Sequence, residues 1–334
     1  MQFARFIIVR AMLALVTLTL VSFIVFSLME LVPGDCAERY VAFKATTGEG
    51  ITEADVQAER VRLGLDKPFF VRWTTWIGNV FLRGDFGESC ILRQSVNDLL
   101  KDKFFISLAI ALSALFVAYA IAVPVGIIAA TSQNAFLNGS LRFISYLGLA
   151  LPNFLLALII MLVWSEVYNE TPTGLFSKEY RDAPWDLDKF LDFLSRAWIP
   201  IFILGWSATA FALQTVRALM LDEAGKLYVT AAAARGVHGR RLLWRYPARH
   251  ALGPIINSLG FDLNRVFNEL PIVALILILT EAGMLLFESL ARSNDQQLAG
   301  AIIFLLTATI VAVNFLTDVA LALIDPRVRK GLLA

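Results

Sequence analysis

The chain has 334 residues, of which 58% are hydrophobic and only 17% are charged, and its mean hydropathy is +0.68. In an ordinary soluble protein, roughly a quarter of the residues are charged. The core of a soluble protein of this length could not bury so much apolar surface. An integral membrane protein is therefore predicted, and a net charge of +1 gives no reason to expect a nucleic-acid partner.

Six stretches of the sequence are long and apolar enough to cross a membrane as helices. Such a helix needs about 20 mainly apolar residues, because the hydrocarbon layer is ~30 Å thick. The six predicted spans are residues 11–29, 104–141, 143–165, 197–216, 255–279 and 296–317, with a polar break at 131–134. The first has a poor cleavage site after it, so we expect it to remain as a helix. The predicted fold is all-α, with one transmembrane domain over residues 1–334.

The distribution of Lys and Arg predicts how these spans are oriented. The N-terminus, the loop at 131–142, the segment 217–250 and the C-terminal tail share one side and carry 13 basic but only three acidic residues. The segments 32–103 and 169–197 share the other side and carry 14 basic and 17 acidic residues. Because basic loops stay inside, both termini are predicted to be cytoplasmic.

Residues 32–103 form the longer extracytoplasmic segment, and 169–197 form the second. In the first, the sequence favours a helix around 54–65, a break at 66–68 and an aromatic stretch that includes Trp73 and Trp76. The turn-like run 83–87 follows. Two interpretations remain open. The segment is either a structured loop on the membrane face, where aromatic rings suit the interface, or a docking surface for a partner outside the membrane.

The chain has two cysteines, Cys36 and Cys90, and both fall in this extracytoplasmic segment. An oxidising compartment permits a disulfide there. The alternative is that both remain as unpaired, small hydrophobic residues.

Residues 217–255 form a cytoplasmic segment that is too polar to cross the membrane. The run Leu227 to Ala234 strongly favours a helix, which Gly236 is expected to end. A basic amphipathic helix is predicted next, with Trp244 among its apolar residues. Its basic residues are Arg240, Arg241, Arg245 and Arg249. By charge alone, this segment is typical of any basic cytoplasmic loop.

The order of residues in this segment, however, has a specific likeness. The run 228–236, followed by Arg240-Arg241 and by 257–260, resembles the EAA loop of ABC-importer permeases, and most of all that of the dipeptide and oligopeptide branch. Other motifs of that branch occur elsewhere in the chain, in the same order as in the family. The likeness therefore covers about residues 5–330. The motifs are Leu31-Val32-Pro33-Gly34-Asp35, Leu63-Gly64-Leu65-Asp66-Lys67-Pro68, Arg83-Gly84-Asp85-Phe86-Gly87-Glu88-Ser89, Val123-Pro124-Val125-Gly126, Leu151-Pro152-Asn153-Phe154 and Asp325-Pro326-Arg327-Val328-Arg329.

The chain departs from this pattern in three places. Ala233 stands where the family often has a basic residue, and the run 280–283 replaces a usual Pro-Gly-Leu-Gly. The fifth predicted span also carries charges where the family is usually small or apolar. These departures bear on the substrate more than on the fold.

The resemblance implies a type I ABC-importer permease in a bacterial cytoplasmic (inner) membrane, where it crosses several times and contacts membrane lipid. Its implied partners are a second homologous permease subunit, two ATPase subunits or domains and an extracytoplasmic substrate-binding protein. In such families the EAA loop sits in a cleft of the ATPase, whose closure drives alternating access. The loop residues to which the resemblance assigns this coupling are Ala231, Ala232, Ala234, Gly236 and Val237. A peptide is the expected cargo, with opines, oligosaccharides and metal chelates as alternatives.

The fifth span carries a polar stripe that consists of Ser258, Asp262, Arg265 and Glu269. Their spacing places all four on one helical face, where Arg265 can reach both carboxylates. A charge near the bilayer centre costs at least ~2.5–3.5 kcal/mol, so the stripe must face protein or water. It either lines the substrate path and contacts polar or zwitterionic cargo, or it fixes the helix register through ion pairs, formed within the stripe or with the partner permease.

The sequence contains no sign of a catalytic site. It lacks a Gly-x-x-x-x-Gly-Lys-Ser/Thr loop, so ATP hydrolysis is expected on separate subunits. Its two histidines, His238 and His250, belong to no metal-ligand pattern, and no cofactor or metal is expected. One alternative is a secondary transporter that carries protons or ions on the fifth-span carboxylates. The EAA-like loop favours the ABC importer, because a secondary carrier has no need of a coupling helix.

Overall fold

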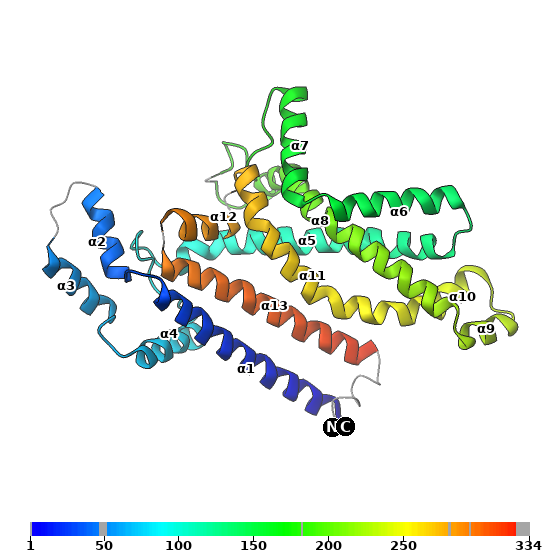
Figure 1. Ribbon diagram of the computed structural model, residues 1–334, viewed down its shortest axis with the longest axis horizontal. Helices are drawn as coiled ribbons and strands as arrows, with labels where there is room; N and C mark the ends of the chain where they lie inside the picture. Colours follow the sequence, from blue (N-terminus) through cyan, green and yellow to red (C-terminus); the bar gives the residue numbers. More distant parts are fainter. Residues whose placement is uncertain (1, 47–51, 182, 280–281, 294, 325–334) are drawn as a thin grey trace. The chain divides into compact units, whose positions relative to one another are not determined.

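The computed structural model describes residues 2–46, 52–181, 183–279, 282–293 and 295–324 (Figure 1). The described residues are almost entirely helical, and their one β-bridge joins Glu88 to Ser95. The helices are α1 (Gln2–Leu31), α2 (Cys36–Thr46), α3 (Glu53–Leu63), α4 (Phe69–Arg83), α5 (Val96–Thr131), α6 (Ala135–Ala150), α7 (Asn153–Tyr168), α8 (Leu187–Ala224), α9 (Leu227–Ala234), α10 (Gly239–Arg245), α11 (Pro247–Leu277), α12 (Ala282–Phe287), the π-helical turn η1 (Glu288–Arg292) and α13 (Gln296–Ile324).

Four helices within the described residues have the length and hydropathy of a membrane span. They cover Phe3–Leu31, Val96–Thr131, Leu187–Ala224 and Gln296–Leu323. These ranges include the first, fourth and sixth predicted spans in full. The second predicted span is divided, because α5 ends at Thr131 and α6 begins at Ala135, so the polar break falls where it was expected.

The third predicted span, 143–165, is wrong as a single straight helix. α6 and α7 instead meet at a bend of 99°, which Figure 1 shows clearly. The cause is Pro152, which has no N–H to donate and which disfavours a helical conformation at the preceding residue. Leu151 is accordingly extended, with φ −88° and ψ 114°.

α11 corresponds to the fifth predicted span but begins eight residues before it, at Pro247. With 31 residues it is long enough to cross a membrane. It is not among the four helices that are apolar enough to be membrane spans, because Asp262, Arg265 and Glu269 lie within it. The motif 325–329, predicted to close the chain, lies outside the described residues.

The chain divides into two compact units. Unit 1 consists of Met1–Ile8, Leu108–Leu279 and Val313–Ala334, and unit 2 consists of Val9–Ser107 and Thr280–Ala312. Unit 1 holds the polar stripe and the cytoplasmic segment, and unit 2 holds the first extracytoplasmic segment.

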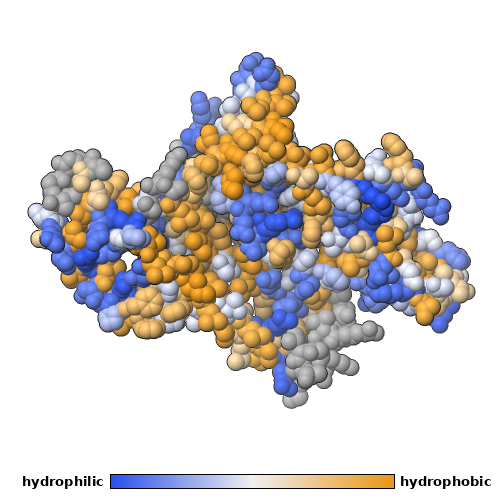
Figure 2. Space-filling view, viewed as in Figure 1, coloured by the Kyte–Doolittle hydropathy of each residue, from blue (hydrophilic) through white to orange (hydrophobic). Residues whose placement is uncertain are grey.

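In unit 1, α5, α8 and α11 pack around a core that lies next to the cytoplasmic segment. This cluster contains Ile127, Val216, Met220, Ala248, Ala251 and Ile255. Gly205 of α8 allows a close approach, since a Cβ atom there would lie 3.2 Å from the Ala114 carbonyl oxygen of α5. In Figure 2, hydrophobic surface follows α7, and hydrophilic residues gather at the tip of that helix.

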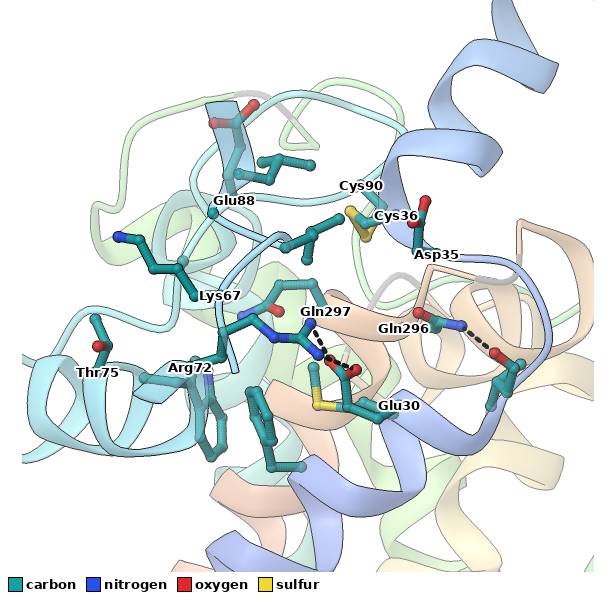
Figure 3. Close-up of a pocket in the computed structure, with 18 of the residues that line it drawn as sticks. Glu30, Asp35, Cys36, Lys67, Arg72, Thr75, Glu88, Cys90, Gln296 and Gln297 are labelled. Atoms are coloured by element: carbon teal, nitrogen blue, oxygen red, sulfur yellow. Dashed lines mark hydrogen bonds and ion pairs between the residues drawn. A yellow bond between two sulfur atoms is a disulfide. The ribbon is translucent and has the colours of Figure 1, made fainter. Parts of the chain in front are cut away.

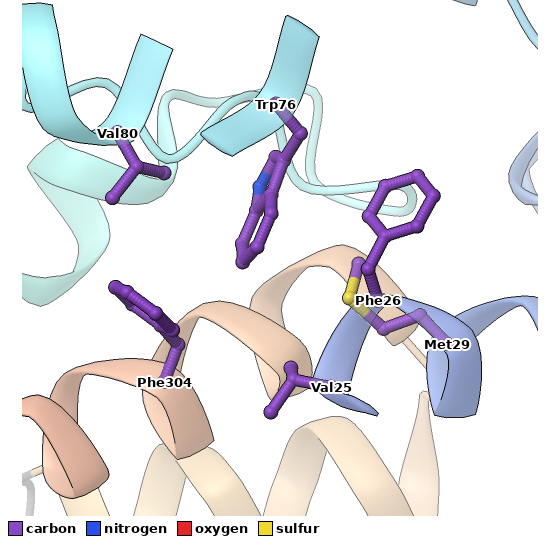
Figure 4. Packing of buried hydrophobic residues seen from close by; sticks show 6 residues of the cluster. All are labelled: Val25, Phe26, Met29, Trp76, Val80 and Phe304. Atoms are coloured by element: carbon purple, nitrogen blue, oxygen red, sulfur yellow. The ribbon is translucent and has the colours of Figure 1, made fainter. Parts of the chain in front are cut away.

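In unit 2, α1 and α13 pack against the aromatic helix α4. The cluster consists of Val25, Phe26, Met29, Trp76, Val80 and Phe304 (Figure 4). The predicted helix around 54–65 is confirmed as α3, which ends at Gly64 in the left-handed conformation (φ +66°). The surface over α2 and α3 is largely hydrophilic (Figure 2).

Candidate functional site

The four residues of the polar stripe lie along α11, but their surroundings differ. Asp262 is only 2% exposed. It accepts hydrogen bonds from Tyr119 of α5 and, at 3.3 Å, from the Ser258 hydroxyl, while the Tyr119 and Ser258 oxygens are 3.1 Å apart. Asp262 therefore ties α11 to α5. One of its carboxylate oxygens, Oδ1, is buried without a hydrogen-bond partner.

Arg265 is half-buried and faces a different neighbour. Its guanidinium carbon lies 5.3 Å from the ring centroid of Phe211 in α8, which is a cation–π contact. Its Nη2 atom is buried and has no hydrogen-bond partner. Within the described residues, Arg265 forms no ion pair with Asp262 or Glu269 at 4.0 Å or less. The structure thus lacks the self-paired triad that the spacing allows.

Glu269 is half-buried and lies beside the start of α7. It accepts a hydrogen bond from the side-chain amide of Asn153, which also donates to the Ser207 hydroxyl at 3.1 Å. Asn153 is buried and directly follows the Pro152 bend, so the break between α6 and α7 sets its position.

The three partners Tyr119, Phe211 and Asn153 have no role that the sequence predicts. Asn153 belongs to the quoted Leu151–Phe154 motif, and a proline followed by a polar residue inside an apolar stretch is a signal that could have identified it. Tyr119 is similarly a hydroxyl-bearing residue in an uncharged span. Phe211 gave no such signal, because a phenylalanine is expected in any membrane helix.

The cytoplasmic segment begins with α9, whose bounds are those predicted from the sequence. Its C-cap residue is Arg235, and Gly236 follows in the left-handed conformation, with φ +86°. The Gly236 and Val237 N–H groups donate to the carbonyls of Ala233 (2.9 Å) and Ala232 (3.2 Å), a Schellman arrangement that ends the helix. A glycine is favoured here because the left-handed conformation is costly for other residues.

The five residues expected to couple to the ATPase fall into two groups. Ala231, Ala234 and Gly236 are exposed, and Val237 is partly exposed. Ala232 is only 4% exposed and packs within the chain itself. No atom lies within 4 Å of a Cβ built on Gly236, so this turn presents open backbone to its surroundings.

Tyr228 anchors α9 to the adjoining helices. Its hydroxyl donates to Glu223 at the end of α8, and its ring lies 5.2 Å from that of His250. Burial and the Glu223 hydrogen bond raise the pKa of the Tyr228 hydroxyl above its usual range, so it remains a donor.

Five arginines around α10 are exposed and form no ion pair in the part of the chain that the structure describes. They are Arg235, Arg240, Arg241, Arg245 and Arg249. This surface is available to an acidic partner.

The extracytoplasmic segment is held by covalent and ionic links. A disulfide joins Cys36 to Cys90, with their Cα atoms 5.2 Å apart. The buried carboxylate of Asp295, just before α13, accepts hydrogen bonds from the Ser89 hydroxyl (2.5 Å) and the N–H groups of Cys90 (3.2 Å) and Leu298 (3.0 Å). These contacts fasten the start of α2, the loop around Cys90 and the start of α13 to one another.

Ion pairs add to these links. Glu59 of α3 pairs with Arg62 at 2.9 Å and with Arg93 at 2.7 Å. Burial alone would raise the pKa of Glu59, but the hydrogen bonds and charge of Arg62, joined by Arg93, outweigh it and hold the pKa below its usual value. The side chains of His, Cys, Asp and Glu among the described residues form no group of three or more that could hold a metal ion.

Comparison with known proteins identifies related chains over nearly the full length. The profile described as "Binding-protein-dependent transport system inner membrane component" matches residues 122–330. A second, for the N-terminal part of such membrane components, matches residues 3–111.

Two relatives are transport permeases of other bacteria. The chain is 27% identical to the oligopeptide transport system permease protein AppB of Bacillus subtilis, over 97% of this chain and 99% of that protein. It is 26% identical to the di/tripeptide transport system permease protein DppB of Pseudomonas aeruginosa, over 92% of this chain and 94% of that protein. Among solved structures, an inward-facing MetNI methionine ABC transporter matches with a TM-score of 0.53 and 16% identity, over 68% of this chain and 96% of that chain.

These matches agree with an all-helical type I importer permease fold. Permeases of this family work with other permease, ATPase and binding-protein subunits, and ATP hydrolysis takes place on the separate ATPase subunits. The chain thus belongs to the family of binding-protein-dependent transport system inner membrane components, as a multi-pass, non-catalytic permease subunit of an ABC importer in the cytoplasmic membrane.

Proposed function

We propose that this permease imports peptides and that Arg265 and Glu269 of α11 contact the peptide on its way through the membrane. The similarity to AppB and DppB, which transport oligopeptides and di- or tripeptides, supports the cargo class. The observation that carries the proposal is the pair of half-buried, opposite charges on one face of α11, neither of which pairs with the other.

The two charges suit the two ends of a peptide. A guanidinium with a free N–H is a strong partner for a carboxylate, and the Nη2 of Arg265 is free. The Glu269 carboxylate would accept hydrogen bonds from the terminal ammonium group, while Asn153, which also donates to Ser207, holds its position. Asp262, by contrast, is only 2% exposed and accepts hydrogen bonds from Tyr119 and Ser258 through one carboxylate oxygen, so its role would be to hold α5 and α11 together.

Coupling to ATP hydrolysis would use the turn after α9. The exposed Ala231, Ala234 and Gly236, with Val237 beside them, would dock in a cleft of an ATPase subunit, while the buried Ala232 would keep the helix packed. The partners would be a second homologous permease, two ATPase subunits and an extracytoplasmic binding protein. The EAA-like loop and the family both favour this assembly over a secondary transporter.

The test compares uptake of a short peptide with free termini and of its C-terminally amidated form by the reconstituted importer. Replacing Arg265 by Gln is expected to lower uptake of the free peptide about tenfold and to leave the amidated form nearly unchanged, since one charged hydrogen bond is lost. Glu269→Gln should show the same selectivity for a free over an acetylated N-terminus.

Asn268→Ala, on the neighbouring face of α11, is the matched control and should affect neither peptide. The proposal is wrong if a variant that combines Arg265→Gln with Glu269→Gln assembles normally and transports every cargo at the wild-type rate. Transport of an opine, oligosaccharide or metal chelate with no peptide uptake would overturn the cargo class alone.

A further inference from the structure

Four exposed arginines lie in unit 1 where α10 leads into α11. They form what we call the basic patch, which consists of Arg240, Arg241 and Arg245 of α10 and Arg249 in the first turn of α11. Figure 1 shows α10 beside α9 at one end of this unit. The function proposed above uses the turn at Gly236 and the polar stripe of α11, and it assigns no role to the basic patch.

The positive charge of the basic patch is not neutralised within the part of the chain that the structure describes, where these arginines form no ion pair. The two acids of the cytoplasmic segment, Asp222 and Glu223, both pair with Lys226. By contrast, Arg72 of the first extracytoplasmic segment pairs with Glu30 at 2.6 Å (Figure 3). Four cations that are close in sequence and have no counter-ion favour an anionic partner.

Trp244 lies on the same side of α10 as the arginines of that helix. It follows Arg240 by four residues, just as Arg245 follows Arg241, and residues four apart are neighbours on a helix surface. The two leucines of α10 are partly buried, whereas Trp244 is 50% exposed. Tryptophan is enriched at the boundary between membrane and water, where its ring is in apolar and its N–H in polar surroundings. An exposed tryptophan among arginines therefore indicates the headgroup layer of a membrane.

The position of the patch along the chain agrees with this layer. The apolar part of α11 is expected to begin at Ile255, six residues after Arg249, which is about 9 Å along the helix. Each headgroup layer extends roughly 5–8 Å beyond the hydrocarbon core. A long arginine side chain covers the remaining distance while its charge stays in the polar layer. Only Tyr246 separates α10 from α11, so the rest of the patch is tied to the same end of the span.

We propose that the basic patch and Trp244 bind anionic phospholipid headgroups of the cytoplasmic leaflet and thereby hold the start of α11 at the membrane surface. Clusters of about four or more basic residues next to the cytoplasmic end of a membrane helix attract such lipids. The planar guanidinium groups would donate hydrogen bonds to the lipid phosphates in pairs. Arg235 is not included, because it adjoins the turn at Gly236 that is proposed to dock in the ATPase.

The experiment measures which lipid lies next to Trp244 in the full-length chain, without ATPase subunits. The protein is reconstituted in phosphatidylcholine nanodiscs with increasing shares of brominated phosphatidylglycerol or brominated phosphatidylcholine, whose bromine atoms quench tryptophan fluorescence on contact. Subtracting the emission of a Trp244→Phe variant isolates the emission of Trp244. We expect half of this emission to be quenched at an about tenfold smaller share of brominated phosphatidylglycerol than of brominated phosphatidylcholine.

Charge-removing variants test whether the arginines cause this preference. Combining Arg240→Gln, Arg241→Gln and Arg245→Gln should bring the two shares to the same value, because most of the charge that attracts phosphatidylglycerol is lost. The matched control makes the same loss of charge on the extracytoplasmic side and should keep the preference of the wild type. It replaces by Gln three exposed basic residues, which are Arg83, Lys178 and Arg181.

Equal shares of the two lipids in the wild type overturn the proposal. A triple variant that keeps the preference also overturns it, and if that variant no longer binds the ATPase, the arginines serve that subunit instead. On the wild type, salt at about 1 M, where the screening length is ~3 Å, should remove most of the preference. An unchanged preference contradicts the proposal even if the triple variant fails to fold. Because no peptide transport is measured, the result is independent of the function proposed above.

Discussion

The extracytoplasmic segment 32–103 and the cytoplasmic segment 217–255 are both polar and helical, yet they are held in different ways. The first is fastened by the Cys36–Cys90 disulfide, by the Asp295 hydrogen bonds and by the ion pairs of Glu59. The second ends α9 in an open glycine turn and leaves five exposed arginines without ion pairs among the described residues.

On the function proposed above, this difference would separate a segment that is stabilised by its own links from one that binds a partner subunit. Cross-links restrict the unfolded chain and preserve one arrangement, as suits the outer end of a pore. The unpaired arginines and the exposed backbone at Gly236 can still form ion pairs and hydrogen bonds with an acidic partner surface. Substitutions in the first segment should therefore change stability, and substitutions in the second should change coupling.

The largest effect is expected at Gly236. Gly236→Asp places a negative charge on the open turn, and we expect uptake to fall by at least about tenfold while membrane insertion and the unfolding temperature stay unchanged. Gly236→Asn is the matched control, since asparagine has the same shape, no charge and a tolerance for the left-handed conformation. Unchanged uptake and ATPase stimulation in Gly236→Asp would show that this turn is not the coupling surface.

The next largest effect is expected from loss of the Cys36–Cys90 disulfide. Its cysteines have a sequence separation of 54, and its loss is expected to lower the free energy of unfolding by about 4 kcal/mol. Cys36→Ser, Cys90→Ser and the double variant should unfold at the same reduced temperature, because either change breaks the same bond. Thiol labelling of the unreduced wild type, folded and unfolded, should find no free cysteine, and labelling of both would contradict the bridge.

A smaller loss of stability is expected at Asp295. Asp295→Asn keeps one acceptor oxygen but leaves part of a buried donor set unmet, at a cost of about 2–3 kcal/mol in thermal unfolding. Asp66→Asn, at an exposed position in the same segment, should cost almost nothing. If both variants unfold at the same temperature, Asp295 does not fasten the loop to α13.

The smallest change in stability is expected at Glu59, and it depends on pH. The pKa of Glu59 is lower in the folded chain than its ordinary unfolded value of about 4.3, so its contribution is complete above that value and is lost as the pH falls through the folded pKa. Glu59→Gln should therefore cost about 1 kcal/mol near pH 7, and this cost should shrink as the pH falls below about 4.3. A difference that persists unchanged below that pH would mean that the charge of Glu59 is not what stabilises α3, and Glu53→Gln is the exposed control.

The sequence predicts elements whose signals are local. α9 has its expected bounds, α3 forms where a helix around 54–65 was expected, and the break between α5 and α6 falls at the polar run 131–134. The 99° bend was missed because hydropathy continues unchanged across Pro152. Contacts such as Ser89–Asp295, which are 206 residues apart, and Tyr119–Asp262 could not be derived, since no local pattern records which side chains meet.

The bend between α6 and α7 also bears on how the chain enters the membrane during synthesis. Each of these helices has 16 residues, which gives a length of about 24 Å, less than the ~30 Å of hydrocarbon that a stable span must cover. Neither helix can therefore be released into lipid from the insertion machinery as an independent span. The pair must wait for α8 and α11, which follow it in the chain and pack against it, so insertion of this region is expected to be a cooperative and comparatively late event in biogenesis.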